Sequence, residues 1–469
     1  MDAVLDSLTE FAVGLKHQQI PDGVLQAARE RLLDSVGCAV GAVAGDTVAI
    51  ARALAPPPAA GDPGGRLLCF DEVVATDAAA FANSCMIRLL DFNDTYPGGH
   101  PSDMLGGLLG SAARHGATGA RLLTAMVVAY EVYIRLQMKA QFRERGWDQG
   151  GGIGVAAAAG LCNLLGLTPD QTRHALAITT VGNMPLRNTR AGQLSMWKGC
   201  ATAYAVRNAA FGVQLAQLGM TGPQAPFTGR HGMMDQASGP FELPDFDTFY
   251  LPRAKIKYWP VAYNMQLAAW AGVELRRLVP VENIAAIDVA TYWSAWSESG
   301  SEPAKWDPRT QGTADHSLPY ILARALRHGA VNPDAFEPEA YLDPTIRPLM
   351  AKIAVRVDEA IQAQFPATIR MRAIATDLDG ATHEVDIVNP IGHEDNPISP
   401  QGLAEKFDRL CLPVLGQERT VAARRFWGAL AEDADIGAGF DLLSLAPDAP
   451  ARAVRLPPSP SLFVPESAS

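Results

Sequence analysis

The sequence predicts a mostly α-helical protein, in which a large all-helical domain carries an inserted, smaller α+β lid domain. Apolar residues recur at helical spacing through residues 1–270, whereas segments within 271–398 alternate in polarity or are rich in β-branched residues. Helical spacing returns over 399–445, which we expect to pack on the first domain. Residues 446–469 hold six prolines and little periodic apolar sequence, which predicts a disordered tail.

The N-terminal part is predicted to be a succession of helices. Apolar residues recur every three or four positions over 25–36, and Thr118 is a suitable N-cap for a long helix. Glu131 and Arg135 lie four residues apart, which predicts an ion pair on the surface of that helix. The glycine-rich stretch 146–154 predicts a turn before the next helix. The expected helices are two within 1–55, then 75–90, 118–139, 155–166, 169–180 and 196–218.

The inserted domain is predicted from its strands. Gly380 separates two β-branched segments, as in a hairpin. Helix-like segments at 316–328 and 344–351 are interleaved with the strands, which indicates an α+β arrangement. The expected strands are 284–293, 352–357, 369–376 and 382–388.

Composition excludes several classes of protein. The formal net charge of −11 argues against a nucleic-acid partner, although local lysines and arginines can still bind an anionic substrate. No uncharged apolar run approaches about 18 residues and no signal peptide is visible, so we expect no membrane span and a cytoplasmic location. The six cysteines form no CxxC pair, which predicts buried free thiols and neither a zinc site nor an iron–sulfur cluster.

One loop, residues 91–103, concentrates groups that can carry chemistry. It holds three carboxylates, an amide, two hydroxyls, a phenol and the imidazole of His100 between two apolar segments. A helix cap is the simpler interpretation, because Asp94 or Thr95 can accept from exposed N–H groups. Capping needs only one such residue, so the concentration favours a catalytic loop held by two helices.

Three further clusters stand out, and the residues alone leave their roles open. Lys198 begins an apolar helix, where a lysine either extends to the surface or faces an internal anion. The stretch 255–260 places two lysines beside aromatics and can equally be a solvated edge. Within 313–320, Asp315 is a candidate helix cap and His316 is a candidate structural or functional histidine.

These segments together resemble the MmgE/PrpD family, which includes 2-methylcitrate dehydratases, cis-aconitate decarboxylase and iminodisuccinate epimerase. The resemblance covers nearly the whole chain except its tail. The segments that carry it are Asp91–Thr95 with His100–Ser102, Ala129–Val132, Gly146–Gln149, Ser195–Gly199, Gly219–Pro223, Ile256–Val261, Thr313–Tyr320 and Asn396–Ser399.

The resemblance implies a helical domain, an α+β lid, a homodimer and catalysis without a cofactor or metal. It implies His100 as the leading acid or base, with Asp91 and Thr95 orienting it or the substrate, and Tyr320 donating a hydrogen bond from the lid. Lys198 and Lys257 are implied to hold substrate carboxylates. Further substrate contacts are expected at Arg190, Asn264, Gln266 and His316.

The implied activity is a lyase that eliminates water from a citrate-like di- or tricarboxylate. Some pocket positions depart from the family pattern: Asn264 and Asp148 stand where relatives carry histidine, and Gly312 where they carry glutamate. An amide cannot transfer a proton at neutral pH, so the substrate is open. The alternatives are a decarboxylase or epimerase of a related dicarboxylate, and a catalytically weakened binding or structural protein.

Overall fold

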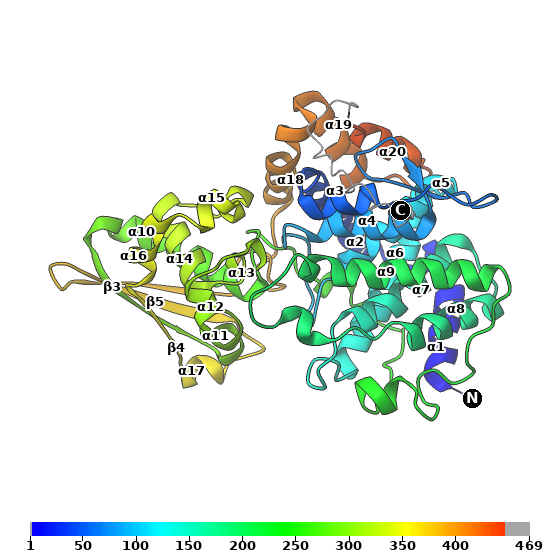
Figure 1. Cartoon of the computed structure of the whole chain (residues 1–469), viewed down its shortest axis with the longest axis horizontal. Helices are drawn as coiled ribbons and strands as arrows, with labels where there is room; N and C mark the ends of the chain where they lie inside the picture. Colours follow the sequence, from blue (N-terminus) through cyan, green and yellow to red (C-terminus); the bar gives the residue numbers. More distant parts are fainter. Residues whose placement is uncertain (1, 446–469) are drawn as a thin grey trace, which may run out of the picture.

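A computed structural model describes residues 2–445 and shows two lobes side by side (Figure 1). One lobe is helical and contains both the N-terminal elements and the last helices of the chain; the other contains a sheet with helices around it. The protein is therefore mostly α, as the sequence predicts. The tail prediction for 446–469 lies outside the described residues.

The helical lobe has one continuous apolar core. Its buried residues run from Val4 to Ile256 and resume from Leu403 to Leu443, so the chain returns to this lobe after leaving it. Its helices are α1 Ala3–Gly14, α2 Asp22–Gly41, α3 Asp46–Ala53, α4 Thr76–Arg88, α5 Leu105–Arg114, α6 Gly119–Lys139, α7 Gly150–Leu165, α8 Pro169–Gly182, α9 Trp197–Gln217, α18 Pro400–Leu415, α19 Gln417–Gly428 and α20 Ile436–Leu443. A two-residue ladder pairs β1 Gly65–Arg66 with β2 Val73–Val74.

The returning helix α18 packs closely against α2. A Cβ atom added at Gly37 would lie 3.0 Å from the ring of Phe407, and one at Gly41 would lie 2.8 Å from the side chain of Leu410. The two helices therefore approach through glycines, and apolar side chains of α18 fill the space that these glycines leave.

The second lobe is built on a four-stranded sheet with the order β4-β3-β5-β6. β3 pairs in parallel with β4 and antiparallel with β5, and β5 and β6 form the hairpin predicted around Gly380. A separate apolar core, Trp259 to Val385, joins the sheet to its helices. The elements are β3 Ile284–Thr291, β4 Ile353–Val357, β5 Arg370–Asp377, β6 Thr382–Val388, α10 Gln266–Leu278, α11 Trp293–Ser299, α12 Pro303–Trp306, α13 Gln311–Ala314, α14 Leu318–His328, α15 Pro338–Tyr341, α16 Arg347–Met350 and α17 Glu359–Gln362.

The local predictions are confirmed in part. Thr118 caps α6 by accepting from the N–H of Arg121, and each predicted strand lies within two residues of an observed one. The turn predicted over 146–154 is wrong beyond Gln149, because the glycines from Gly150 onward already form α7. The segment 1–55 holds three α-helices rather than two.

The surface ion pair predicted on α6 is wrong. Glu131 and Arg135 do pair, but both side chains are completely buried. Glu131 also accepts from the backbone N–H groups of Tyr250 and Leu251, at 2.8 and 2.7 Å. The pair therefore anchors a long connecting segment onto α6, a tertiary role that the i,i+4 spacing alone does not indicate.

The prediction of buried free thiols is confirmed, because all six cysteines are free and buried. In residues 2–445 no single helix combines the length and apolar composition needed to cross a membrane. One bent pair, Asp22–Gly41 with Asp46–Ala53, meets that test by length and composition. The lid behaviour of the second lobe stays a prediction.

Candidate active site

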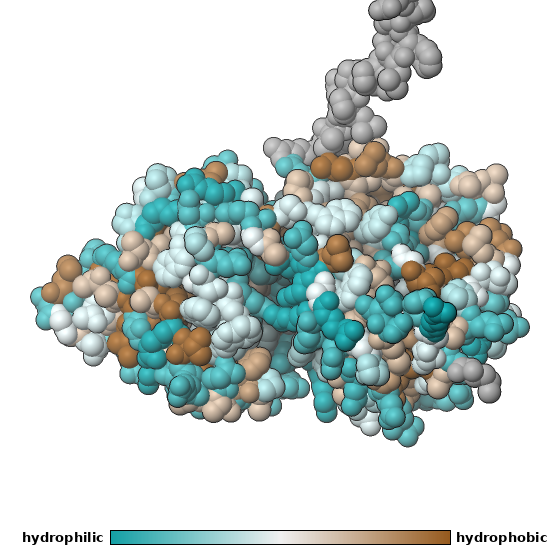
Figure 2. Space-filling view, turned by 60° about the horizontal axis from the view of Figure 1, so that its bottom comes forward, coloured by the Kyte–Doolittle hydropathy of each residue, from teal (hydrophilic) through white to brown (hydrophobic). Residues whose placement is uncertain are grey.

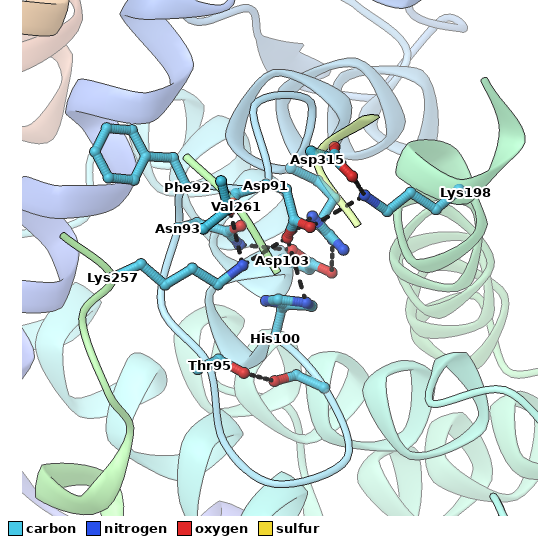
Figure 3. A network of polar contacts seen from close by, with 12 residues as sticks. Asp91, Phe92, Asn93, Thr95, His100, Asp103, Lys198, Lys257, Val261 and Asp315 are labelled. Atoms are coloured by element: carbon cyan, nitrogen blue, oxygen red, sulfur yellow. Dashed lines mark hydrogen bonds and ion pairs between the residues drawn. The ribbon is translucent and has the colours of Figure 1, made fainter. Parts of the chain in front are cut away.

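The loop after α4 places one carboxylate, Asp91, at the centre of a cluster of cations (Figure 3). Arg88 Nη1 donates to Asp91 Oδ1 at 2.7 Å, Lys257 Nζ to the same oxygen at 2.6 Å, and Lys198 Nζ to Oδ2 at 3.0 Å. Asp91 adopts a left-handed backbone conformation, with φ +47°, which turns the chain sharply out of the helix. Burial raises the carboxyl pKa, but the three cations outweigh it and hold the pKa well below its usual range.

Lys198 links the two lobes. It begins α9 in the helical lobe, and its ammonium also donates to both carboxylate oxygens of Asp315, each at 3.1 Å, from the sheet lobe. The side chain is only 6% exposed. Of the two roles left open, contact with an internal anion is therefore the correct one, and the surface-directed role is wrong.

His100 is held as a neutral imidazole with one free ring nitrogen. Its Nδ1 lies 2.8 Å from the backbone carbonyl of Asp94, which can only accept, so Nδ1 carries the proton. Burial, with Arg88 and Lys257 nearby, holds the pKa of His100 well below its usual range. Nε2 lies 3.7 Å from Asp91 Oδ1 and is left as an unprotonated acceptor.

His316 provides a second neutral imidazole, from the sheet lobe. Its Nδ1 hydrogen bonds the carboxylate of the adjacent Asp315 and also lies 3.3 Å from the ammonium of Lys198. Burial and the ammonium of Lys198 lower the pKa of His316 to about 4. Since Nδ1 also lies 3.7 Å from Asp91 Oδ2, the two histidines flank the same carboxylate.

A cavity of about 410 Å³ lies at the junction of the lobes and is lined by residues from both. Hydrophilic side chains gather along this junction on the surface (Figure 2). Cations dominate the lining: seven lysines and arginines face three carboxylates. The cations are Arg88, Arg143, Arg187, Arg190, Lys198, Lys255 and Lys305, and the carboxylates are Asp91, Glu298 and Glu302. This local excess opposes the negative charge of the chain and suits an anionic ligand.

Three more predicted site residues line this cavity. Thr95 donates its hydroxyl hydrogen to the carbonyl of Gly99 at 3.0 Å, which closes the loop below His100. Arg190 pairs with Asp148, with Nε 2.6 Å from Oδ2. Asn264 accepts from the hydroxyl of Tyr292 at 2.8 Å and donates to Glu298 at 3.3 Å. The histidine-to-Asp148 departure thus supplies the partner that orients Arg190.

Two predicted site residues lie away from the cavity wall. The Tyr320 hydroxyl donates to the backbone carbonyl of Ala335, and its ring packs against Phe336 in the core of the sheet lobe. Gln266 is completely buried and bonds the backbone N–H and carbonyl groups of Trp259, at 2.9 and 2.8 Å. Both side chains hydrogen bond to the backbone and neither lines the cavity, so this geometry does not support the predicted donor role of Tyr320 or the predicted substrate contact of Gln266.

Lys257 is also placed differently from the prediction. It is completely buried, and it donates to both the backbone carbonyl and the carboxylate of Asp91, at 2.7 and 2.6 Å. It is not among the residues that line the cavity. Lys257 therefore fixes Asp91 from behind, and a direct contact with a substrate carboxylate is not what its geometry supports.

The buried charge of Lys257 predicts a pH-dependent stability effect. Burial lowers the pKa of Lys257 to about 8 in the folded protein, below the ordinary 10.5 of an unfolded lysine. Between these values the unfolded chain binds the extra proton, so the free energy of unfolding rises with pH. Comparing wild type with Lys257→Met by urea unfolding, we expect the wild-type advantage to grow by up to about 3 kcal/mol from pH 8 to pH 10. A difference that stays constant or shrinks over this range would contradict the assignment.

Sequence reasoning missed several residues of the site. Arg88, the last residue of α4, is completely buried and pairs with Asp91 three residues later. This spacing is typical of an ion pair at a helix end. Gln149 accepts from the backbone N–H of His100 at 2.9 Å and so fixes the loop. Asp315, interpreted as a possible cap, instead orients Lys198 and His316. Only tertiary contact reveals these roles.

Asp91, Asp315 and His316 bring potential metal ligands within 4.8 Å of one another. Carboxylates and imidazole are suitable donors for a divalent cation. Among the described residues, however, the ammonium of Lys198 already lies 3.0 Å from Asp91 Oδ2 and 3.1 Å from both oxygens of Asp315. The lysine thus supplies the positive charge that these carboxylates bind.

The fold and the site together define a class: a two-lobed, mostly helical protein with a cation-rich cavity between its lobes. The chain belongs to the MmgE/PrpD family. Residues 6–244 match the MmgE/PrpD N-terminal domain and residues 259–428 match the MmgE/PrpD C-terminal domain. The resemblance drawn from the sequence segments is therefore confirmed.

Relatives with assigned names are similar over most of their length. The chain is 29% identical to a 2-methylcitrate dehydratase of Cupriavidus necator, with 91% of each chain covered. It is 29% identical to the fungal alkylcitrate dehydratase phiI, over 82% of this chain and 83% of that protein. It is 27% identical to the cis-aconitate decarboxylase-like protein oryM of Aspergillus oryzae, over 94% of this chain and 97% of that protein. The dehydratase names support an enzyme role, and they differ in the substrate.

Proposed function

We propose that this protein is a lyase that eliminates water from a citrate-like polycarboxylate by acid/base catalysis, with no cofactor. The observation that carries the proposal is the neutral imidazole of His100, whose free Nε2 lies at a cavity where cations outnumber carboxylates. The dehydratase names of two relatives support the same reaction class. The substrate would be a small di- or tricarboxylate.

His100 would act as the base. Removal of a proton beside a carboxylate needs an unprotonated acceptor at working pH, and burial keeps Nε2 in that state. The backbone carbonyl of Asp94 fixes the tautomer, and Gln149 fixes the backbone of His100. These contacts hold the base in one orientation before substrate arrives, which lowers the entropic part of the barrier.

The cations would stabilise the charge that forms on the substrate carboxylate as the proton leaves. Lys198 and Arg88 line the cavity beside His100 and are themselves oriented by Asp91. A preorganised cation in a partly dry site stabilises a developing anion without reorganising at the moment of reaction. The departing hydroxide would take its proton from this ammonium-rich wall.

A second activity has a specific observation in its favour. His316, on the opposite lobe, presents another neutral imidazole at the same cavity. One base on each side of a carbon is the arrangement that epimerisation of a dicarboxylate requires. Decarboxylation is supported only by the printed name of one relative. The catalytically weakened binding protein is the third alternative.

A substrate panel tests the proposal. Purified protein is incubated with 2-methylcitrate, citrate, cis-aconitate and iminodisuccinate while enoate absorbance, carbon dioxide release and optical rotation are followed. Enoate formation without gas supports the dehydratase, gas release supports a decarboxylase, and a change of rotation alone supports an epimerase. No turnover together with no carboxylate binding by calorimetry would overturn the enzyme proposal.

The homodimer implied by the family is also a proposal, and the outer face of α9 supports it. Four exposed apolar residues recur every seven positions along this helix and at the residue that follows it, and the helix runs along one side of the helical lobe (Figure 1). They are Trp197, Tyr204, Phe211 and Leu218, which are 45%, 41%, 52% and 89% exposed. A row of large exposed apolar side chains, here called the apolar stripe, is typical of a surface that a partner covers.

Phe211→Asp should convert a dimer into a monomer, because it places a charge in the middle of the apolar stripe. The measurement is sedimentation equilibrium at micromolar concentration. Val421→Asp is the matched control: Val421 is 42% exposed on α19, outside α9, and its replacement should leave the mass unchanged. Equal masses for wild type and Phe211→Asp would contradict the use of this face.

A further inference from the structure

Lys305 is a buried ammonium on the cavity wall that takes no part in the network around Asp91. It lies in α12 of the sheet lobe, is 4% exposed and lines the cavity. Among residues 2–445 its Nζ makes no hydrogen bond and no ion pair. Every other fully buried lysine of the described chain, Lys198, Lys257 and Lys406, has a carboxylate within 3.1 Å.

An unpartnered buried lysine carries a stability cost. Burial lowers the pKa of Lys305, and the ammonium of Lys198 lowers it further, while Glu302 and Asp315 act in the opposite direction without pairing with it. Two ammonium groups that influence each other repel unless an anion lies between them. An anion that enters from the cavity would pair with the ammonium of Lys305 and remove this cost.

The local backbone holds Lys305 firmly in this position. Ser317 donates its hydroxyl hydrogen to the carbonyl of Lys305, and the backbone N–H of Lys305 donates to the backbone carbonyl of Glu302 at 3.0 Å. The indole of Trp306 donates to the carbonyl of Gly300 at 2.9 Å. A rigid short helix that points a free cation into a cavity is preorganised for a ligand.

Two other cations on the wall lack a carboxylate partner within the described chain. Arg187 and Lys255 are half-buried, and Lys255 lies over the ring of Tyr263, 5.3 Å from its centre. The remaining cations of the lining are already paired, apart from Lys305. Lys305, Arg187 and Lys255 therefore have positive charge available for an anionic ligand in the cavity.

We propose that Lys305 binds one terminal carboxylate of a tricarboxylate substrate and so selects tricarboxylates over dicarboxylates. This inference rests on the proposed function and adds a residue that determines specificity. Lys198, oriented by Asp91 and Asp315, would serve the carboxylate at the reacting carbon, and Lys305 the next one along the chain.

The test is calorimetric binding of two inert probes, tricarballylate and succinate, to wild type, Lys305→Met and Lys305→Arg. We expect Lys305→Met to weaken tricarballylate binding about 10- to 100-fold, which corresponds to one lost charged hydrogen bond, and to change succinate binding much less. Lys305→Arg should retain most of the affinity for tricarballylate. Lys352→Met is the matched control, because Lys352 lies in the same lobe and donates to the carbonyl of Ile284 outside the cavity.

Thermal unfolding provides a second readout that does not depend on binding. Without ligand, Lys305→Met should melt at or above the wild-type temperature, because an unpartnered buried charge is removed. Tricarballylate should raise the melting temperature of Lys305→Met less than it raises that of the wild type. Unchanged tricarballylate affinity in Lys305→Met would overturn this inference alone. Failure of wild type to bind either carboxylate would overturn the proposed function and this inference together. If Lys305→Met does not fold, Lys305→Gln replaces it in the same measurements.

Discussion

Asp91→Asn should destabilise the protein by about 3–5 kcal/mol, because it leaves buried cations without their anion. Arg88, Lys198 and Lys257 all donate to this carboxylate, and Lys257 has no other carboxylate partner in the described chain. Asparagine has the same shape and tolerates the left-handed backbone that this position requires, with φ +47°. The expected loss of stability therefore reflects the missing negative charge and not backbone strain. Urea unfolding at pH 7 is the measurement.

Asp103→Asn is the matched control for that experiment. Asp103 lies in the same loop and is also completely buried, but burial raises its pKa to about 6 and its nearest cation, Arg88 Nε, is 3.7 Å away. The ionised Asp103 carboxylate lowers the stability of the folded protein near neutral pH, so its replacement should not destabilise the protein by more than about 1 kcal/mol. Equal losses in both variants would show that Asp91 does not organise the cations.

The sequence predicts the site best where the chemistry is local. The loop 91–103 is recognisable because its density of polar groups exceeds what capping needs, and Asp91, Thr95 and His100 do reach the cavity. The four strands of the larger sheet are recognisable because β-branched residues and alternating polarity are typical of strands. Lys198 is recognisable as an anomaly, a lysine at the head of an apolar helix.

The errors arise where tertiary contacts decide what a side chain faces. Tyr320 follows His316 by only four residues, yet Tyr320 turns into the core while His316 faces the cavity. Lys257 lies in a segment typical of the family, but its ammonium donates to the backbone carbonyl and the carboxylate of Asp91 and does not reach the cavity. Lys305 has no local signal at all, because its free ammonium becomes evident only when every neighbour is placed.

His100→Asn should lower kcat by about 10²- to 10⁴-fold, the usual contribution of a general base. The asparagine amide can still donate to the carbonyl of Asp94, so the loop should keep its conformation and the free energy of unfolding should change by less than about 1 kcal/mol. What is lost is the acceptor at Nε2. The measurement is single-turnover kinetics with the substrate that the panel identifies, together with urea unfolding of the same variant.

His316→Asn separates elimination from epimerisation in the same assay. Elimination by the proposed route removes one proton, at His100, so His316→Asn should retain proton abstraction, seen as incorporation of deuterium from D₂O into recovered substrate. A two-base epimerase exchanges that proton on one side and returns it from the other, so either variant should stop inversion. Because Asp91 lies 3.7 Å from both imidazoles, loss of exchange in His316→Asn alone would reassign the base to the sheet lobe. Full activity in His100→Asn would rule out its proposed role in either reaction.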